Sequence, residues 1–352
     1  MIFRQMLDAA SGTYSYLLAS RRGGEALIID PVLEKVDRYV QILNELDLRL
    51  VKAIDTHLHA DHITGLGALR ERTQCITVMG EQSKADVVSM RVNDGDRIDI
   101  EGLRLGVIYT PGHTDDSYSF SMEDRVFTGD TLLIRGTGRT DFQNGDPRAQ
   151  YESIFNRLLK LPDQTLVYPA HDYKGETVST IGEEKAYNPR LRVQSVEQYV
   201  ELMTNLKLPN PKMMDVAVPA NGKIGLSQGE VARRGWAVTT GEFAHAIGQS
   251  GTAIVDIREI TEREEQGTVP ETLHVPYAAL ADTLRPGGIL HQTGIAKKLI
   301  FICTFGERSA IAVQLAQAVG LDQARHLHGG LAEWRARTQV HQEPSVNSSL
   351  VW

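Results

Sequence analysis

Cysteine is scarce in this chain: its 352 residues include only Cys75 and Cys303. Two cysteines cannot make the disulfide framework of a secreted domain, so a reducing cytoplasm is the expected compartment. A secretion signal and an Arg/Ser-rich transit segment are also missing, because strand-like sequence begins directly after Met1. We therefore expect a cytoplasmic protein.

Long hydrophobic runs and basic blocks are absent too. No apolar run approaches the roughly 18 residues that cross a bilayer. The formal net charge is −8, and no segment concentrates Lys and Arg, so neither a membrane nor a nucleic acid is an expected partner. With 41% hydrophobic residues, a chain of this length is expected to form two domains, each with its own core.

What the chain does have is a dense group of histidines and carboxylates. Residues 54–62 hold three histidines and two aspartates, and they follow an apolar, strand-like run at Leu50–Ile54. Neutral imidazole and ionised carboxylate are both metal ligands. A polar loop could hold three histidines by chance, but the pattern His-x-His-x-Asp-His combines ligand types with ligand spacing. The segment therefore predicts a metal site.

Three more candidate ligands occur in the same context, each after an apolar strand and a turn: His113, Asp130 and His171. A single histidine after such a turn is usually an ordinary loop residue. Residues at the ends of several strands of one sheet can converge on one point, however, while the strands stay rigid. We therefore expect these side chains to join His57 in one site.

These motifs resemble the metallo-β-lactamase superfamily over about residues 1–225. The resemblance rests on Thr56–His62, Gly112–His113, Gly129–Asp130 and His171. It implies an α/β fold of the αββα sandwich type, with the metal site at one edge. Two branches of the superfamily compete. Glyoxalase II-like thioesterases bind two metals and hydrolyse acyl-glutathione, whereas persulfide dioxygenases bind one iron and oxidise glutathione persulfide to sulfite.

Several stretches are similar to the dioxygenase branch, namely Ile63–Gly65, Arg135–Gln143, His171–Tyr173 and Asn188–Leu191. This similarity implies one Fe(II) per chain. The residues it implies are the metal ligands His57, His113 and Asp130; the outer-shell or second-site groups His59, His62 and His171; the catalytic or orienting carboxylate Asp61; and the glutathione contacts Arg139, Tyr173 and Arg190. The ligand types alone suit zinc as well as iron.

The C-terminal part reads as a separate domain. Residues 206–223 have the proline and glycine content of a linker, although Met213–Val218 is apolar enough to pack on the first domain. The predicted boundaries are 1–225 for the first domain, 226–240 for a linker, and 241–352 for the second domain with its tail. Buried strands are expected at Thr252–Arg258 and Lys298–Ile302.

Cys303 lies between a strand and the expected N-terminus of a helix. Backbone N–H groups and the nearby Arg308 can stabilise a thiolate there. The alternative, a buried inert thiol, fits Cys75 better. Asp256–Arg258, the Cys303-x-x-x-x-Arg308 loop and Gly329–Trp334 resemble a rhodanese domain with a parallel sheet, over about residues 236–340. The resemblance implies that Cys303 carries a persulfide sulfur, with Arg308 as its catalytic neighbour.

Together the two resemblances predict a persulfide dioxygenase–rhodanese fusion. The implied small molecules are glutathione persulfide, glutathione, O2, sulfite and thiosulfate; a homo-oligomer is left open. Glu307 places an acidic side chain inside the cysteine loop, which leaves open whether an anionic donor such as thiosulfate is preferred. The direction of sulfur flow is open as well. The alternative is a dizinc glyoxalase II-like hydroxyacylglutathione hydrolase with a rhodanese module for docking or sensing.

Overall fold

The chain folds into two compact units, Met1–Gly225 and Leu226–Trp352, in a computed structural model. The structure describes residues 1–206, 208, 213–225 and 227–340. The C-terminal tail, predicted from the sequence at 342–352, lies outside the described residues.

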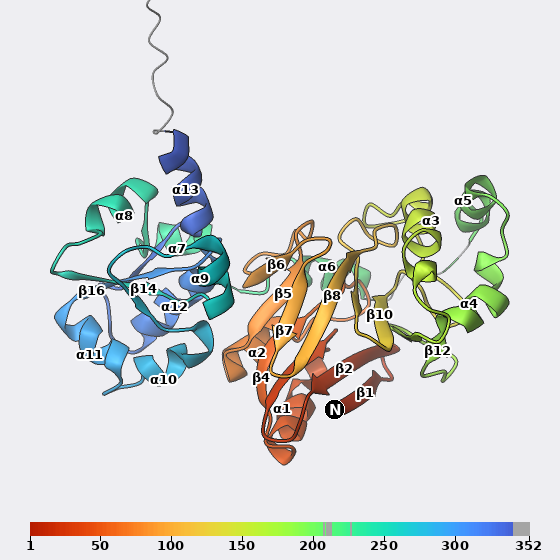
Figure 1. Cartoon of the computed structure of the whole chain (residues 1–352), viewed down its shortest axis with the longest axis horizontal. Helices are drawn as coiled ribbons and strands as arrows, with labels where there is room; N and C mark the ends of the chain where they lie inside the picture. Colours follow the sequence, from red (N-terminus) through yellow and green to blue (C-terminus); the bar gives the residue numbers. More distant parts are fainter. Residues whose placement is uncertain (207, 209–212, 226, 341–352) are drawn as a thin grey trace, which may run out of the picture. The chain divides into compact units, whose positions relative to one another are not determined.

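The first unit contains two six-stranded mixed sheets (Figure 1). The first sheet has the order β1-β2-β3-β4-β5-β6, and its strands are β1 (Ile2–Asp8), β2 (Thr13–Ala19), β3 (Glu25–Ile29), β4 (Arg49–Ile54), β5 (Ile76–Gly80) and β6 (Met90–Val92). The second has the order β12-β11-β10-β9-β8-β7, and its strands are β7 (Arg97–Ile100), β8 (Leu103–Tyr109), β9 (Tyr118–Ser121), β10 (Arg125–Gly129), β11 (Leu166–Pro169) and β12 (Ser179–Thr180). The β3–β4, β4–β5 and β10–β11 pairs are parallel.

The two sheets pack face to face through aromatic side chains. The rings of Tyr16 on β2 and Phe127 on β10 have centroids 5.0 Å apart, and the Tyr16 hydroxyl donates to the carbonyl of Pro169 at 2.5 Å. Every residue of β2 is buried, because a strand covered on both faces has no side that meets water. The inter-sheet layer therefore forms the rigid base from which the loops of the site extend.

Helices cover the two outer faces. Helix α1 (Val36–Glu45) buries Val36, Tyr39, Ile42 and Leu43 at helical spacing, and α2 (Leu66–Thr73) buries Leu66 and Leu69 against the same sheet. Helices α3 (Pro147–Phe155), α4 (Ile181–Tyr187) and α5 (Val196–Thr204) pack on the second sheet. Short 3-10 turns lie at Leu33–Lys35, Leu158–Lys160 and Pro189–Leu191. The predicted αββα sandwich is confirmed.

Helix α6 (Met214–Asn221) completes the first unit. It lies in the stretch whose composition is typical of a linker, and it contains Pro219. Its Ala217 and Asn221 are buried, and Ile224 joins the core cluster beneath α1 and α2. The apolar side chains of this stretch therefore pack on the first unit, which was one of the two alternatives that the sequence allowed.

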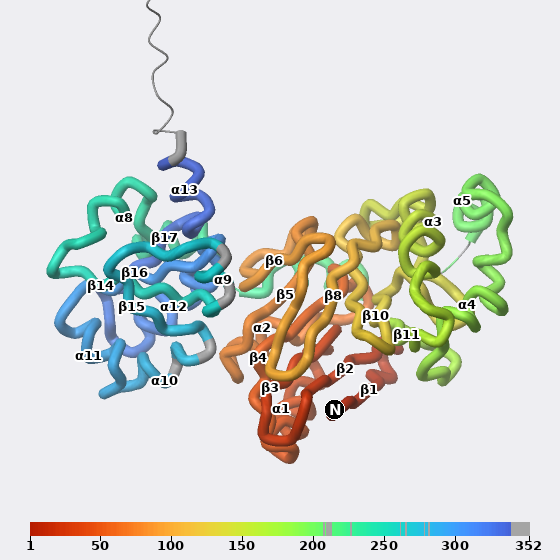
Figure 2. The backbone as a smooth tube through the Cα atoms, viewed as in Figure 1, coloured from red at the N-terminus to blue at the C-terminus, as the bar shows by residue number. Residues whose placement is uncertain are grey.

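The second unit is a five-stranded, all-parallel sheet with helices on both faces (Figure 2). The order is β13-β17-β16-β14-β15, and the strands are β13 (Ala237–Val238), β14 (Thr252–Asp256), β15 (Thr272–His274), β16 (Lys298–Ile302) and β17 (Arg325–Leu327). The helices are α7 (Gln228–Arg233), α8 (Thr240–Ala246), α9 (Ile260–Gln266), α10 (Leu280–Leu284), α11 (Ile289–Ala296), α12 (Glu307–Ala318) and α13 (Gly330–Val340), with a 3-10 turn at Tyr277–Ala279.

The segment 226–240, predicted as a linker, carries regular structure where it is described. Helix α7 begins at a capping box between Ser227 and Glu230, and β13 pairs with β17. Strand β13 thus belongs to the sheet of the second unit, and α7 belongs to the same unit. Both elements are too short to give a clear periodic signal in the sequence.

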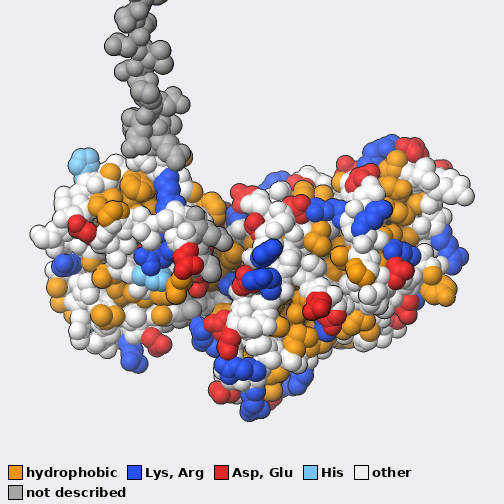
Figure 3. Space-filling view, in the orientation of Figure 1, with side chains coloured by type: hydrophobic (Ala, Val, Ile, Leu, Met, Phe, Trp, Pro, Cys, Tyr) orange, Lys and Arg blue, Asp and Glu red, His pale blue; other side chains and the backbone are white. Residues whose placement is uncertain are grey.

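The surface on the face shown in Figure 3 mixes the two signs of charge, with Lys and Arg side chains interspersed among Asp and Glu side chains. In the part of the chain that the structure describes, no helix combines the length and the apolar character that a bilayer crossing requires.

Candidate active sites

The histidine-rich loop follows β4 directly and is buried, with His57, His59 and His62 at most 4% exposed. Asp30, at the end of β3, braces its start. Its carboxylate accepts the backbone N–H of Thr56 at 2.7 Å, the Thr56 hydroxyl at 3.0 Å and Nε2–H of His59 at 3.1 Å. A charged residue ending an otherwise apolar buried strand was the signal in the sequence that could have identified Asp30.

Asn221, at the end of α6, braces the far side of the same loop. Its amide nitrogen donates to the carbonyl oxygens of His59 and His62 at 2.9 and 2.8 Å, and its amide oxygen accepts the N–H of Thr64 at 2.8 Å. The Asn221 side chain is buried, so these bonds are sheltered from water. Sequence reasoning missed Asn221, because nothing in a proline-rich stretch points to a bond with a loop so distant along the chain.

His57, His113 and Asp130 come together as predicted from the strand ends, with one ligand atom of each within 4.8 Å of the others. Nε2 of His113 lies 3.6 Å from Oδ2 of Asp130. The remaining imidazole nitrogens are engaged elsewhere: Nδ1 of His113 donates to the carbonyl of Arg139 at 2.7 Å, and Nδ1 of His57 to the hydroxyl of Thr56 at 3.0 Å. The Thr56 hydroxyl donates its own hydrogen to Asp30, so it can only accept from His57, and the imidazole hydrogen of His57 is on Nδ1. Both imidazoles therefore keep an Nε2 lone pair for a cation.

Asp61 and His171 form a hydrogen-bond network beside this group. Oδ2 of Asp61 accepts from Nε2 of His171 at 2.8 Å, from Nδ1 of His62 at 2.9 Å and from the hydroxyl of Thr13 at 2.9 Å. Nδ1 of His171 donates to Oδ1 of Asp130 at 2.6 Å. An ionised carboxylate can only accept, so both ring nitrogens of His171 carry hydrogen.

The charges of this network follow from its geometry. Burial opposes charge at His171, but Asp130 and Asp61 hold its pKa well above the usual value. Burial likewise opposes charge at Asp61, and His171 and His62 hold its pKa well below the usual range. The arrangement is an imidazolium clamped between two carboxylates, and an imidazolium has no lone pair for a metal.

A second potential cation group, His59, Asp61 and His62, also has ligand atoms within 4.8 Å. Nδ1 of His59 and Nε2 of His62 are buried and have no hydrogen-bond partner among the described residues. One feature argues against a second metal here: Asp30, against the effect of burial, raises the pKa of His59 to about 9. Asp61 accepts its three protein donors through Oδ2, and its Oδ1 lies 3.9 Å from Nδ1 of His59.

The predicted glutathione contacts lie in three different settings. The Arg139 guanidinium donates to both carboxylate oxygens of Asp141 at 2.6 Å and lies over the ring of Phe142, which meets His113 edge-on at 5.9 Å. The Tyr173 ring stacks on His171 at 5.9 Å and is 75% exposed. These two residues therefore flank the metal group. Arg190, by contrast, donates to the hydroxyl of Thr137 at 3.1 Å and is partly buried.

Cys303 follows β16 and begins a loop that enters α12. Its sulfur is buried and accepts the N–H groups of Gly306 at 3.2 Å and Ser309 at 3.4 Å. Gly306 has a φ of +87°, and a Cβ there would lie 2.9 Å from the nitrogen of Gly329. The loop is thus a backbone cradle of the kind that favours negative charge on sulfur.

Arg308, predicted as the catalytic neighbour of Cys303, forms a two-pronged ion pair with Glu262. The two terminal nitrogens donate to the Glu262 carboxylate at 2.7 and 2.5 Å, and the Thr304 hydroxyl donates to the same carboxylate at 2.9 Å. Although burial opposes its charge, Glu262 has its pKa lowered to about 2 by Arg308. The positive charge of Arg308 is therefore largely neutralised. Glu262 was missed from the sequence, where it reads as an ordinary first-turn carboxylate of α9.

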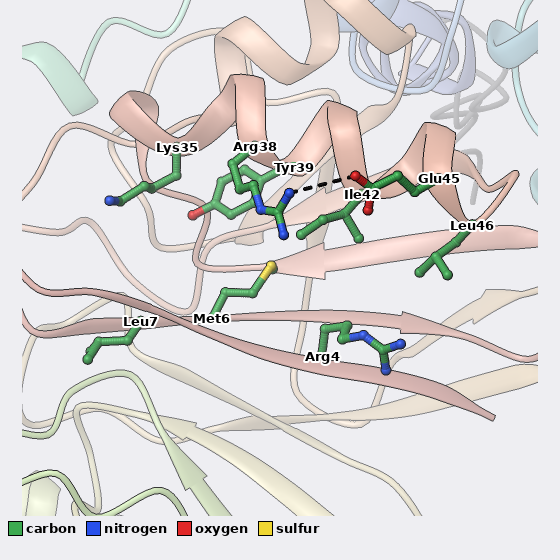
Figure 4. Close-up of a pocket in the computed structure, with 9 residues that line it drawn as sticks. All are labelled: Arg4, Met6, Leu7, Lys35, Arg38, Tyr39, Ile42, Glu45 and Leu46. Carbon is green, nitrogen blue, oxygen red and sulfur yellow. Dashed lines mark ion pairs between the residues drawn. The ribbon is translucent and has the colours of Figure 1, made fainter.

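A separate groove of about 380 Å³ lies between α1 and the edge strand β1 (Figure 4). Lys35 pairs there with Asp8 at 3.3 Å and Arg38 with Glu45 at 3.8 Å, while Arg4 donates to the carbonyl of Phe3 at 2.9 Å. None of the predicted site residues lines it, so the candidate chemistry lies elsewhere.

Comparison with known proteins shows which families the two units resemble. Residues 9–85 and 82–171 match the metallo-beta-lactamase superfamily, and residues 239–337 match the rhodanese-like domain. The mitochondrial persulfide dioxygenase ETHE1 of Mus musculus is 45% identical over 229 residues, which are 64% of this chain and 89% of that protein. The chain belongs to the persulfide dioxygenase family. The Homo sapiens protein of the same name is 46% identical over 229 residues, which again cover 64% of this chain and 89% of that protein.

Solved structures agree with this family assignment. ETHE1 from Myxococcus xanthus is 54% identical and superimposes with a TM-score of 0.62, covering 63% of this chain and 98% of that one. A metallo-beta-lactamase from Staphylococcus aureus, 22% identical with a TM-score of 0.60, covers 93% of this chain and 98% of its own and shows the fold alone. The predicted combination of a family member with a C-terminal rhodanese domain is confirmed.

Proposed function

We propose that the first unit oxidises glutathione persulfide with O2 to sulfite and glutathione. The overall reaction balances as one persulfide, one O2 and one water giving glutathione, hydrogen sulfite and a proton. The relatives named persulfide dioxygenase, which share 45% identity or more with the first unit, support the reaction class. Glutathione as the carrier thiol and iron as the metal are part of the proposal.

His57, His113 and Asp130 would hold one Fe(II). Two imidazoles and a carboxylate are the donor set of mononuclear iron oxygenases, and three protein ligands leave positions for substrate. When bound, iron supplies the redox chemistry that lets O2 react with a persulfide. The chain contributes the fixed orientation of each ligand: the carbonyl of Arg139 holds His113, the Thr56 hydroxyl holds His57, and His171 holds Asp130.

The observation that carries the one-metal proposal is the engagement of Asp61 and His171: Oδ2 of Asp61 accepts hydrogen bonds from His171, His62 and Thr13, and Nδ1 of His171 donates to Asp130. A second cation held by Oδ2 of Asp61 and by His171 would have to displace these hydrogen bonds. Asp61 then acts as a positioning carboxylate that keeps His171 protonated. His171 in turn keeps Asp130 oriented. Arg139 and Tyr173, which flank the group, are the candidates for contacts to the glutathione moiety.

In the second unit, Cys303 would carry sulfur as a persulfide. The Cys303 thiolate attacks the outer sulfur of a donor, the donor's S–S bond breaks, and the electron pair leaves with the donor thiolate or sulfite. In one direction thiosulfate donates and glutathione accepts, which supplies the first unit with substrate. In the other, glutathione persulfide donates and sulfite accepts to give thiosulfate. The N–H groups of Gly306 and Ser309 stabilise the charge in both forms.

The test combines metal analysis with turnover. Purified protein should contain one iron per chain, consume O2 when glutathione persulfide is added, and release sulfite in equal amount. Two zinc ions per chain together with hydrolysis of an acyl-glutathione thioester would contradict the proposal. The cytoplasmic location and the oligomeric state stay predictions.

A further inference from the structure

Ser309, in the first turn of α12, places its hydroxyl at the meeting point of three groups. Its Oγ lies 3.0 Å from the carbonyl oxygen of Gly306, 3.3 Å from Nδ1 of His326 and 3.6 Å from the sulfur of Cys303. All of these side chains are buried, with Ser309 and His326 fully so. The hydroxyl therefore bonds only to these partners and not to water.

The tautomer of His326 follows from the same contacts. Its Nδ1 meets the Ser309 hydroxyl, and its Nε2 is buried with no hydrogen-bond partner among the described residues. Burial lowers the pKa of His326 to about 4, with His328 adding to the effect, so the ring is neutral and carries one hydrogen. A buried N–H without a partner costs more than a buried lone pair. The hydrogen is thus on Nδ1, where it is donated to the Ser309 hydroxyl, with the carbonyl oxygen of Gly306 as a further acceptor nearby.

This donation leaves the hydroxyl hydrogen of Ser309 able to change partners. With Cys303 as a thiol, the S–H and His326 both donate to Oγ, and Ser309 donates to the carbonyl of Gly306. With Cys303 charged, the S–H is gone, and the hydroxyl can turn to the sulfur instead. The carbonyl of Gly306 is not left unpaired, because it also accepts the N–H of Ala310 at 3.0 Å.

We propose that Ser309 and His326 form a positioning pair for Cys303, in which His326 orients the Ser309 hydroxyl so that its hydrogen moves to the sulfur whenever that sulfur is charged. The proposal rests on the assignment of Cys303 as the sulfur carrier. It adds a third, switchable donor to the two N–H groups of the loop. The charged or titratable groups of the neighbouring elements are Arg308 with its partner Glu262 and with Glu259, Glu307 in the loop itself, and His328, which lies beside His326 and Glu333.

Rates of sulfur transfer in the full chain test the pair. Ser309→Ala should slow transfer from glutathione persulfide to Cys303 about tenfold, the range expected for one bond to a charged group. Ser309→Thr, which keeps the hydroxyl, should stay within about threefold of the parent. His326→Leu should slow transfer, whereas His326→Asn, which offers an N–H near the position of Nδ1, should restore most of the rate. His245→Leu, on the exposed face of α8, is the matched control.

A double-mutant cycle separates a pair from two independent residues. Ser309→Ala combined with His326→Leu should be no slower than Ser309→Ala alone, because His326 acts only through the hydroxyl. Multiplicative losses, or a normal rate in Ser309→Ala, would overturn the pair. If Cys303→Ser itself retains transfer, the assignment of the sulfur carrier has failed instead.

A spectroscopic measurement does not depend on turnover. Nitrogen-15 NMR of the histidine side chains should find His326 as the Nδ1–H tautomer. The signal should shift when Cys303 is loaded with sulfur, and Ser309→Ala should abolish that shift. An Nε2–H tautomer in the parent protein would contradict the orientation that the pair requires.

Discussion

Nδ1 of His113 lies 2.7 Å from the backbone carbonyl oxygen of Arg139. The side chain of the same arginine extends away from this bond to Asp141 and over Phe142. Arg139 thus supports a candidate metal ligand through its main chain, while its guanidinium, paired with Asp141, is the part that we propose contacts the substrate. Main-chain and side-chain functions of this one position can therefore be separated by mutation.

Arg139→Ala should leave the iron content unchanged, because the carbonyl that holds His113 survives the substitution. The KM for glutathione persulfide should rise about tenfold, since a guanidinium–carboxylate contact is lost. Metal analysis and O2-uptake kinetics give the two readouts. Asp141→Asn is the companion variant, because it weakens the internal pair while keeping the arginine. Loss of iron in Arg139→Ala with no change in KM would remove the side chain from the substrate site.

Asn221→Ala should loosen the metal loop, because three bonds to the segment from His59 to Thr64 disappear. Groups that orient a metal site from outside its ligands typically contribute 10- to 100-fold in metal affinity. We expect iron to dissociate at least about tenfold faster into a chelator. Asn205→Ala, an exposed asparagine at the end of α5, should match the parent. Equal dissociation rates in all three proteins would show that the loop does not need Asn221.

The two active sites should be separable. Cys303→Ser should abolish sulfur transfer and leave O2 consumption with glutathione persulfide within a few-fold of the parent. His113→Ala, or removal of metal by a chelator, should do the reverse. If thiosulfate with glutathione drives O2 uptake in the parent but not in Cys303→Ser, sulfur flows from the second unit to the first. Full sulfur transfer in Cys303→Ser would disprove the nucleophile assignment.

Glu262→Gln should release the positive charge of Arg308, which Glu262 neutralises in the present pairing. A cation beside the sulfur cradle favours a dianionic donor, so the KM for thiosulfate should fall several-fold, with a smaller change for glutathione persulfide. Glu264→Gln makes the same change of charge on an exposed position of α9. A thiosulfate KM that is equal in all three proteins would mean that Arg308 does not meet the donor.

The same pair predicts how acid affects the second unit. The pKa of Glu262 is lowered from 4.5 to about 2, so its stabilisation is present above pH 4.5 and is lost as the pH falls through about 2. A shift of this size corresponds to roughly 3 kcal/mol of unfolding free energy. Thermal unfolding followed from pH 6 to pH 2 should show a steeper loss in the parent than in Glu262→Gln. Parallel curves would indicate that the ion pair contributes nothing to stability.

The sequence predicted the residues whose position follows from strand ends. His57, His113 and Asp130 each come directly after a β-strand or its turn, so the folding of the sheets was enough to bring them together. The Cys303 loop was predictable for a similar reason, because a strand, a short loop and a helix N-terminus define its shape locally. The αββα fold class followed from the resemblance of these motifs to the metallo-β-lactamase superfamily, and the structure and the family comparison confirm it.

The residues that the sequence did not reveal depend on contacts between distant segments. Asn221 lies in a stretch whose composition resembles a linker, and only the packing of α6 on the first unit gives it a partner. His326 and Glu262 meet the Cys303 loop from a neighbouring strand and a neighbouring helix, which no local pattern encodes. The short elements in 226–240 were missed because β13 is held by its pairing with β17 and α7 by packing on β13 and α12, and neither contact has a local pattern in the sequence.

Thr13 and Asn221, which lie near the beginning and the end of the first unit's sequence, both bond to the metal loop. A growing chain emerges from the ribosome N-terminus first, so a nascent chain that lacks α6 already contains every candidate ligand but not the last bonds that hold their loop. Cys303 is synthesised later still. The metal loop thus gains its last side-chain bonds only once α6 has been synthesised, and it gains them before the loop of Cys303 has been added to the chain.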